Sequence, residues 1–231
     1  MAQQDRALRT REALVESAAE IFDREGFSLA SLAMISSRAG VSNGALHFHF
    51  ASKAMLAHAV AEAAEQRLTR LTGRYEGRFP GGSLQLLIDT THDLVRGLGE
   101  DVLLRVGFDA ARSLHESGAS AGSRRLWASW VRETLERARG EGALRQDAPA
   151  DAVAAALVAT TLGLGVLTQS PPVPRADTVT HLWGLLLPVL EAGGVAGRLM
   201  PSGTPAAADR GFFPAPGPAG SGRVVRDVPD G

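Results

Sequence analysis

Apolar side chains recur every three or four residues through most of the chain, which is the spacing of an α-helix that buries one face. A first helix is expected over residues 7–25, and Gly26 is placed to end it. Its apolar face consists of Leu14, Ala18, Ile21 and Phe22. No segment alternates apolar and polar residues with the period of two typical of a strand, so the pattern predicts an all-α fold. Further helices are expected near residues 84–94, 103–108, 126–144, 151–169 and 178–192.

Two short helices with a glycine between them follow the first helix. Ser31 can cap one of them by accepting a hydrogen bond from a backbone N–H of the first turn, and Gly40 can end it. Ser42 can cap the next, which is expected to run to about Phe48. Two short helices joined by a tight turn, here residues 39–41, form the helix-turn-helix pattern of DNA-binding proteins.

A long fourth helix and a C-terminal tail complete the expected organisation. Ser52 can cap the fourth helix, in which Met55, Leu56 and Val60 are expected to face inward. The last 39 residues contain nine Gly and six Pro, a composition typical of segments that do not fold. We expect a helix-turn-helix DNA-binding domain over 1–51, a ligand-binding and dimerisation domain over 52–195, and a disordered tail over 196–231.

Composition narrows the class of protein. A chain of 231 residues with 45% hydrophobic content can bury a substantial core, and the absence of cysteine excludes disulfides and thiolate metal sites. Asp5 and Arg6 stand where a secretory signal needs an apolar run, so a cytoplasmic protein is expected. Residues 152–169 are uncharged, but their Ala, Thr and Gly content favours a buried helix over a membrane span.

Charge limits how DNA could be bound. The net charge of the whole chain is −1, and residues 1–58 contain six Lys or Arg and six Asp or Glu. A balanced surface gives no long-range attraction for nucleic acid. Any DNA binding must therefore rest on a few locally placed groups.

Residues 39–53 give the most specific indication of the class of protein. Residues 39–53 read Ala-Gly-Val-Ser-Asn-Gly-Ala-Leu-His-Phe-His-Phe-Ala-Ser-Lys, and with Leu56 they closely resemble the DNA-binding signature of the TetR family of bacterial repressors. With Ile21-Phe22 and Gly26-Phe27 at the end of the first helix, the resemblance covers residues 6–60. It implies about nine helices, a third helix that lies in the major groove, and an exposed aromatic residue that touches phosphate.

The side chains of this segment suit a close approach to DNA. Ser42 begins a helix whose N–H groups can bind a phosphate oxygen, and Asn43 can bond to phosphate or to base edges. Gly44 and Ala45 are too small to hold the backbone away, and Lys53 can reach a phosphate across the groove. The expected DNA contacts are Ser31, Ser42, Asn43, Gly44, Ala45, His47, Phe48 and Lys53.

Two of these positions depart from the family pattern. His47 stands where the family usually carries Tyr, and Asn43 stands where a basic residue is common in the subgroup described next. Neither side chain carries a permanent positive charge, so both departures weaken the electrostatic contact with DNA. A helical dimer that has lost DNA binding, and that sequesters a ligand or binds a protein, is therefore the alternative function.

A narrower resemblance points to one subgroup. Residues 4–11, the triplet Phe48-His49-Phe50 and the triplet Arg125-Leu126-Trp127 are similar to the γ-butyrolactone receptors of antibiotic-producing actinobacteria. The chain also resembles the pseudo-receptors of that group, which answer to antibiotics. The resemblance implies a repressor that releases operator DNA when a small apolar inducer fills its C-terminal domain. The sequence leaves open whether the ligand is a butyrolactone, a furan or an antibiotic, and whether the chain represses or activates.

Candidate ligand contacts lie beyond the helix-turn-helix. Trp127 and Trp130 share a helix face; the resemblance makes Trp127 a pocket wall, while core packing is the simpler role for Trp130. Thr160 and Thr161 place hydroxyls among apolar residues, where each either bonds to its own helix or anchors a ligand. Ala64 stands where related receptors can offer a glutamine. The expected pocket residues are Trp127, Trp130, Val131, Thr160, Thr161, Leu87, Phe108 and Gln66.

Two C-terminal helices suit a dimer interface. Residues 151–169 are rich in Ala and Gly, so a partner helix can approach closely, and residues 182–190 supply a second apolar stripe. The resemblance implies that these helices, within 151–192, pair with those of a second copy as a four-helix bundle. A monomer core is the alternative. A dimer sets the spacing of two recognition helices, which must fit two major grooves together.

The strongest indication of an enzyme in the sequence is a single motif match. Residues 118–122 match G-x-S-x-G, and Asp147 and His181 follow in hydrolase order, but no strand precedes the serine. No enzyme is therefore expected. The histidines are not spaced for one ligand face of a helix, and no H-E-x-x-H motif occurs, so neither a metal nor a cofactor is expected.

Overall fold

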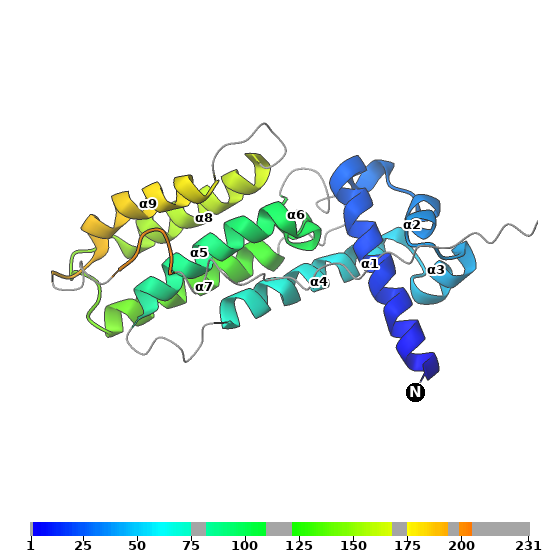
Figure 1. Ribbon diagram of the computed structural model, residues 1–231, viewed down its shortest axis with the longest axis horizontal. Coiled ribbons are helices and arrows are strands. Elements are labelled where there is room, and N and C mark those ends of the chain that lie inside the picture. Colours follow the sequence, from blue (N-terminus) through cyan, green and yellow to red (C-terminus); the bar gives the residue numbers. More distant parts are fainter. Residues whose placement is uncertain (1, 75–81, 110–121, 168–174, 194–198, 205–231) are drawn as a thin grey trace, which may run out of the picture.

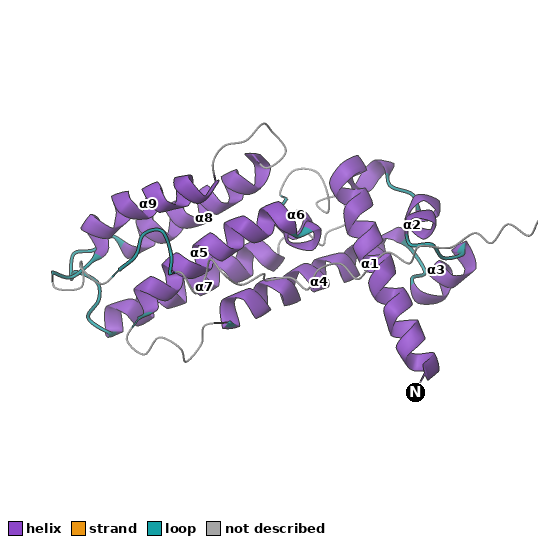
Figure 2. Cartoon of the chain, viewed as in Figure 1, coloured by secondary structure: helices purple, strands orange, loops and turns teal. Residues whose placement is uncertain are grey.

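The computed structural model describes residues 2–74, 82–109, 122–167, 175–193 and 199–204. Within these ranges the chain is helical without a strand, and one isolated bridge pairs Leu144 with Glu191, so the all-α prediction is confirmed (Figure 2). The helices are α1 (Ala2–Leu29), α2 (Leu32–Arg38), α3 (Asn43–His49), α4 (Lys53–Gly73), α5 (Ser83–Glu100), α6 (Val102–Phe108), α7 (Gly122–Gly140), α8 (Ala150–Leu167) and α9 (Arg175–Leu190).

The predicted serine caps of α2, α3 and α4 are confirmed. The Oγ atoms of Ser31, Ser42 and Ser52 accept hydrogen bonds from the backbone N–H three residues further on, at 3.2, 3.1 and 3.2 Å. The end of α1 differs from the expectation, because Gly26 takes φ 80° and ψ 162° and the helix then resumes as far as Leu29. Glycine adopts this backbone without a Cβ clash, so Gly26 kinks the helix and does not end it.

Two hydrophobic cores meet along α4. Its N-terminal half, with Leu56 and Val60, packs with α1, α2 and α3, whereas Leu68 and Leu71 pack with α5, α7, α8 and α9. α4 therefore contributes to both cores, and the domain boundary expected between residues 51 and 52 stays a prediction. Met55 does not face inward as expected but is 52% exposed, because it stands about 100° around the helix from the buried Leu56.

A short helix connects the two cores. α6 inserts Leu103 and Val106 into the core of α1–α4, and Leu104 and Phe108 into the core of the C-terminal helices. Figure 1 shows α1–α3 at one end of an elongated molecule and α8 and α9 toward the other, with α4 and α6 between them. A displacement of either core must therefore be accommodated by α6.

The helix that contains the long uncharged stretch is part of the C-terminal core. α8 packs against α7 and α5, and it buries Val153, Leu157 and Leu164. In the described part of the chain, no helix combines the length and the apolar character needed to cross a membrane.

The beginning of the tail, predicted to be disordered from residue 196, is ordered where the structure describes it. The N–H of Met200 donates to Gln85 Oε1 at 2.7 Å, and the N–H and Oγ1 of Thr204 donate to the carboxylate of Asp89 at 2.8 Å each. Asp89 is fully buried, so these donors replace the water that the acid would otherwise bind. The prediction failed here because composition does not reveal specific partners on α5. The rest of the tail lies outside the described residues.

Candidate DNA-binding and ligand-binding sites

α3 presents its N-terminal end and one face to solvent. Leu46 and the C-cap residue Phe50 are buried and hold the helix on the first core. Ala45 is half-buried, and Ser31 is exposed at the start of α2, where its hydroxyl serves the cap. Contact with DNA stays a prediction, but the structure gathers most of the expected residues on one exposed surface: Ser42, Asn43, Gly44, His47 and Phe48, of which Phe48 is 82% exposed.

The amide of Asn43 is oriented by a neighbour that sequence reasoning missed. Ser36, which is 4% exposed on α2, donates a hydrogen bond of 2.6 Å from Oγ to Asn43 Oδ1. With its carbonyl oxygen engaged, Asn43 keeps the NH₂ group to donate to a base or a phosphate. No motif or period marks Ser36, and only the packing of α2 on α3 brings it to Asn43.

Lys53 is engaged within the protein, in contrast to the expected phosphate contact. Its Nζ donates to the carbonyl oxygens of Phe27, Ser28 and Ala30 at 2.7, 3.2 and 2.9 Å. It also lies 4.5 Å from the centroid of the Phe27 ring. An ammonium group has three N–H donors, and these carbonyls can accept from all three. Lys53 therefore supplies hydrogen-bond donors to the backbone carbonyl oxygens at the end of α1, beyond the kink at Gly26.

Two arginines of the N-terminal domain are paired with acids. Arg24 pairs with Glu25 at 2.9 Å, and Arg38 at the end of α2 pairs with Glu20 of α1. The hydrogen bond and the negative charge of Glu20 raise the pKa of Arg38 above its ordinary value. Because each positive charge has an adjacent negative charge, neither arginine adds much to the field around α3.

A buried hydrogen bond joins two of the expected pocket residues in the C-terminal core. Trp127 Nε1 donates to Thr161 Oγ1 at 2.9 Å, and both side chains are fully buried. The Thr161 hydroxyl can in turn donate to the carbonyl oxygen of Leu157 or Val158, each at 2.9 Å. Of the two roles left open for Thr161, this structure shows the bond to its own helix, together with an acceptor role toward tryptophan.

Most of the other expected pocket residues lie around this pair. The rings of Trp127 and Trp130 stack with 5.3 Å between centroids and 16° between planes. Thr160 is half-buried on α8. The same apolar cluster contains Leu87, Phe108 and Val131, all buried. Trp127 therefore belongs to one buried core with side chains from α5, α6 and α7, as expected of a pocket wall or of a core residue.

Several buried donors in the C-terminal domain have no hydrogen-bond partner among the described residues. They are Thr90 Oγ1 on α5, Trp130 Nε1 and Arg124 Nη1 on α7, and Trp183 Nε1 on α9. Sequence reasoning missed Thr90 and Trp183 as polar candidates, because their neighbours in the chain are those of ordinary core positions. A buried donor without an acceptor is costly, and an acceptor oxygen from a ligand would satisfy it.

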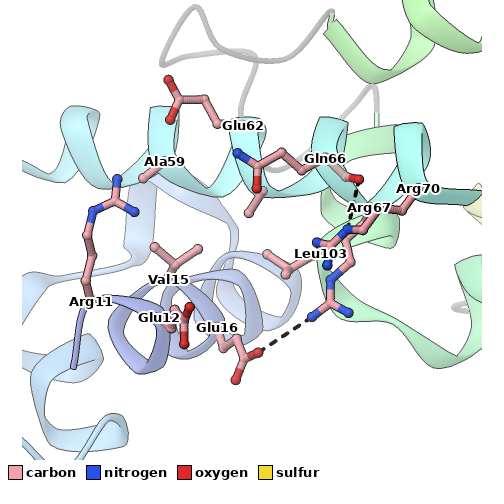
Figure 3. Close-up of a pocket in the computed structure, with 11 residues that line it drawn as sticks. Arg11, Glu12, Val15, Glu16, Ala59, Glu62, Gln66, Arg67, Arg70 and Leu103 are labelled. Carbon is pink, nitrogen blue, oxygen red and sulfur yellow. Dashed lines mark hydrogen bonds and ion pairs between the residues drawn. The ribbon is translucent and has the colours of Figure 1, made fainter. Parts of the chain in front are cut away.

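Gln66 does not reach the expected pocket. It is exposed on α4 and lines a cleft of about 460 Å³ between α1, α4 and α6, beside Arg67 and Leu103 (Figure 3). Two residues of helix turn it about 160° away from Ala64, which is fully buried beneath α6. A Cβ added to Gly107 of α6 would lie 2.5 Å from the Cβ of Ala64, so the α6 backbone leaves no room for a glutamine at position 64.

One arginine on α6 ties the two domains together. Arg105 Nε donates to both carboxylate oxygens of Asp23 on α1, at 3.1 and 3.0 Å. Its Nη1 donates to the carbonyl oxygens of Leu98 and Gly99 at the end of α5, both at 3.2 Å. Sequence reasoning did not single out Arg105, since its partners lie on two other helices, α1 and α5.

The last two helices carry large apolar side chains on their surface. Val166 on α8 is 58% exposed, and Leu185 and Val189 on α9 are 74% and 49% exposed. Exposed apolar groups gathered on neighbouring helices mark an interaction surface. They lie within residues 151–192, the segment expected to form the dimer interface.

Comparison with known proteins relates both domains to one class of regulator. Residues 14–60 match the family model described as bacterial regulatory proteins, tetR family. The chain is 31% identical over 209 residues to the A-factor receptor protein of Streptomyces griseus, covering 88% of this chain and 71% of that protein.

Two solved structures share the fold at 28% sequence identity. One is a gamma-butyrolactone receptor (ArpA-like protein), with a TM-score of 0.66 over 84% of this chain and 93% of that one. The other is CprB from Streptomyces coelicolor in complex with its operator sequence, with a TM-score of 0.67 over 84% of this chain and 94% of that one. The likeness extends through the C-terminal domain, so both resemblances noted from the sequence are confirmed.

Proposed function

This chain belongs to the TetR family of bacterial regulatory proteins, and we propose that it is a homodimeric repressor released from its operator by a small apolar molecule of the γ-butyrolactone class. Regulators of this family bind operator DNA and ligands, form dimers and are not enzymes. The G-x-S-x-G run therefore needs no catalytic role; its residues 118–121 lie outside the described part of the chain.

The observation that carries the ligand part of this proposal is the buried bond from Trp127 to Thr161. An apolar site with one directed polar pair suits a ligand that has an alkyl body and a carbonyl oxygen. Such an oxygen can accept the indole N–H in place of the threonine hydroxyl. The hydroxyl would keep its bond to Leu157 or Val158, so the exchange leaves no protein group unpaired.

The unpartnered donors support an oxygen-bearing ligand. Thr90, Trp130 and Trp183 each present a donor from a different helix of the C-terminal domain. A lactone ring carries a carbonyl oxygen and a ring oxygen, so a largely apolar ligand of this class can still satisfy donors that a pure hydrocarbon would leave unpaired. Similarity to the A-factor receptor protein and to gamma-butyrolactone receptors favours the same class.

On the DNA side, we assign base-edge and close backbone contacts to Ser42, Asn43 and Gly44, and phosphate contacts to His47 and Phe48. The exposure of these residues at one end of the molecule supports the assignment. Small side chains at the start of α3 allow its backbone to approach the groove. The likeness to CprB in complex with its operator favours the same orientation of α3.

The mechanism follows from the way the two domains are joined. In a dimer held by α8 and α9, the two α3 helices must stand about 34 Å apart to enter successive major grooves. Because α6 lies in both cores, a ligand that displaces α5 or α7 also displaces α1 and α4, which carry α3. The ligand shifts the equilibrium between the DNA-binding conformation and one with misaligned α3 helices. The size of this shift is set by how much more tightly the ligand binds the misaligned conformation.

Variants of Trp127 test the proposal. Trp127→Phe keeps a ring but loses the N–H, and we expect it to bind operator like the parent while needing about tenfold more of an alkyl γ-butyrolactone for release, since one hydrogen bond is lost. Trp127→Ala should stay bound at lactone concentrations that free the parent. Gel shifts with the DNA upstream of the chain's own gene measure both effects.

The exposed neighbour Leu126 provides the control. Leu126→Ala, on the same helix, should respond to lactone like the parent. Release of both Trp127 variants at the parent's lactone concentration would make Trp127 a plain core residue and move the pocket elsewhere. If the parent shifts no DNA, the ligand-sequestering dimer becomes the better account.

A further inference from the structure

We propose that the first turns of α1 form a second DNA contact, in which Arg6 and Arg9 bind phosphates beside the groove that α3 enters. The inference rests on the proposed DNA-binding function. It assigns part of that function to a surface outside the helix-turn-helix, where neither the motif nor the net charge of the domain indicates it.

Most of the positive side chains of residues 1–58 are engaged within the protein. Residues 1–58 contain six arginines and lysines. Lys53 is held by carbonyl oxygens of α1, and Arg24 and Arg38 are paired with glutamates. Within the described ranges, neither Arg6 nor Arg9 forms an ion pair. The guanidinium of Arg11 lies over the ring of Phe50. A DNA duplex needs phosphate neutralisation for affinity, and Arg6 and Arg9 remain able to supply it.

The N-terminal end of α1 extends past the point where this helix contacts the end of α3. Arg11 anchors α1 to the end of α3, because its guanidinium lies 5.3 Å from the ring centroid of Phe50. Counting backwards at 1.5 Å per residue, Arg9 lies about 3 Å and Arg6 about 7.5 Å beyond this anchor. Figure 1 shows this end of α1 at the same end of the molecule as α3.

The side chains of Arg6 and Arg9 are placed to bind phosphates at the rim of the major groove. The major groove is about 12 Å wide, so phosphates on its rim lie close to any helix that accompanies α3 toward the duplex. Arg6 and Arg9 are exposed, and the adjacent Leu8 is 59% exposed, so this turn of α1 faces solvent. A guanidinium can bind phosphate through two parallel N–H bonds, which suits arginine better than lysine for this contact.

Charge along α1 is separated in a way that the domain total conceals. Residues 2–11 contain three arginines and one acid, Asp5, whereas five acids follow between Glu12 and Glu25. The N-terminal end of the helix is therefore locally positive, although the domain as a whole is neutral. This end lies beyond the contact to Phe50, and the acids lie beside the body of the domain.

The salt dependence of binding tests the inference. Kd is measured by fluorescence anisotropy for an operator selected from random DNA and for a scrambled duplex, between about 50 and 200 mM salt. Each lost phosphate contact lowers the slope of log affinity against log salt by about 0.9, so Arg6→Gln with Arg9→Gln should lower it by about 1.8 for each bound protomer. The affinity deficit of the double variant should then shrink roughly tenfold for each bound protomer over that range, or about a hundredfold for a bound dimer, on both duplexes.

A matched control removes the same charge elsewhere. Arg139→Gln with Arg145→Gln lies in the C-terminal domain and should leave the slope unchanged. Glutamine keeps the helix propensity of arginine, so circular dichroism should show all variants folded. A parental slope in the Arg6 and Arg9 variant, or a loss confined to the operator, would overturn the inference. If the parent binds neither duplex, the proposed function fails first and this inference fails with it.

Discussion

The ammonium group of Lys53 lies 4.5 Å from the centre of the Phe27 ring and donates a hydrogen bond of 2.7 Å to the carbonyl oxygen of the same residue. Two further carbonyl oxygens, of Ser28 and Ala30, accept from the same group. A side chain from the first turn of α4 thus holds the kinked end of α1. Both helices pack with α2 and α3 in one core. We infer that Lys53 affects DNA binding through the shape of the domain.

Lys53→Met should lower the free energy of unfolding by about 2 kcal/mol, because the part-buried carbonyl oxygens of Phe27 and Ala30 lose a charged donor while the aliphatic stem is kept. Urea unfolding followed by circular dichroism measures the change. The salt dependence of DNA affinity should match that of the parent as long as the protein is folded. Parental stability combined with a lower salt slope would instead restore the phosphate contact expected from the sequence.

Asn43→Ala should relax the preference for one base pair of the operator, because the amide donor at the start of α3 is lost. The expected loss of discrimination is about 1 to 3 kcal/mol, confined to that position. Ser36→Ala should cause a smaller loss at the same position, since Ser36 Oγ donates to Asn43 Oδ1. Affinities for a set of single-base operator variants measure both effects. Ser37→Ala, on the exposed side of α2, is the control, and an equal effect there would remove the role of Ser36.

Two truncations should separate the ordered start of the tail from the remainder. Removing residues 205–231 should leave the melting temperature unchanged, because the bonds to Gln85 and Asp89 remain. Removing residues 197–231 takes those bonds away from a buried carboxylate and should cost about 2 kcal/mol, or about 4 to 8 °C in melting temperature. Equal melting temperatures for the two proteins would show that residues 199–204 contribute nothing to the body of the protein.

Leu185→Glu should convert the dimer to monomer, because it would replace the most exposed of the apolar side chains named on α8 and α9 by a charge. Sedimentation velocity measures the change in mass, and operator affinity should fall with it, since a single recognition helix fills only one groove. Leu126→Glu introduces the same charge at a 42% exposed leucine of α7 and should stay dimeric. A dimeric Leu185→Glu variant would place the interface elsewhere.

Arg105→Lys should weaken the coupling between ligand and DNA. Lysine keeps the charge but cannot bind the carboxylate of Asp23 and the carbonyl oxygens of Leu98 and Gly99 in one forked contact. The ratio of operator Kd with and without saturating lactone measures the coupling, and we expect it to fall at least fivefold, or about 1 kcal/mol. Asp23→Asn should act in the same way, and the double variant should be no worse than either single one, since both break one link. Additive losses would mean that the two residues act separately.

The amino-acid sequence by itself determined the class of fold and the place of the DNA-reading helix. The spacing of residues such as Leu14, Ala18 and Phe22 predicted buried helix faces, and the serines before α2, α3 and α4 predicted the helix starts. These features are local: a helix period or a cap depends on residues within one or two turns of the chain. Local signals of this kind can be recognised without knowing what lies across the core.

Only the tertiary structure decided which polar groups meet. Lys53 looks like a phosphate ligand in the sequence, yet its partners stand 23 to 26 residues earlier in the chain. Thr204 binds an acid on α5 that lies 115 residues away, within a tail whose composition favours disorder. Gln66 and Ala64 differ by only two positions but face solvent and α6 respectively. Such contacts depend on how helices pack in three dimensions, and neither the order nor the composition of the residues encodes that packing in a form that can be read locally.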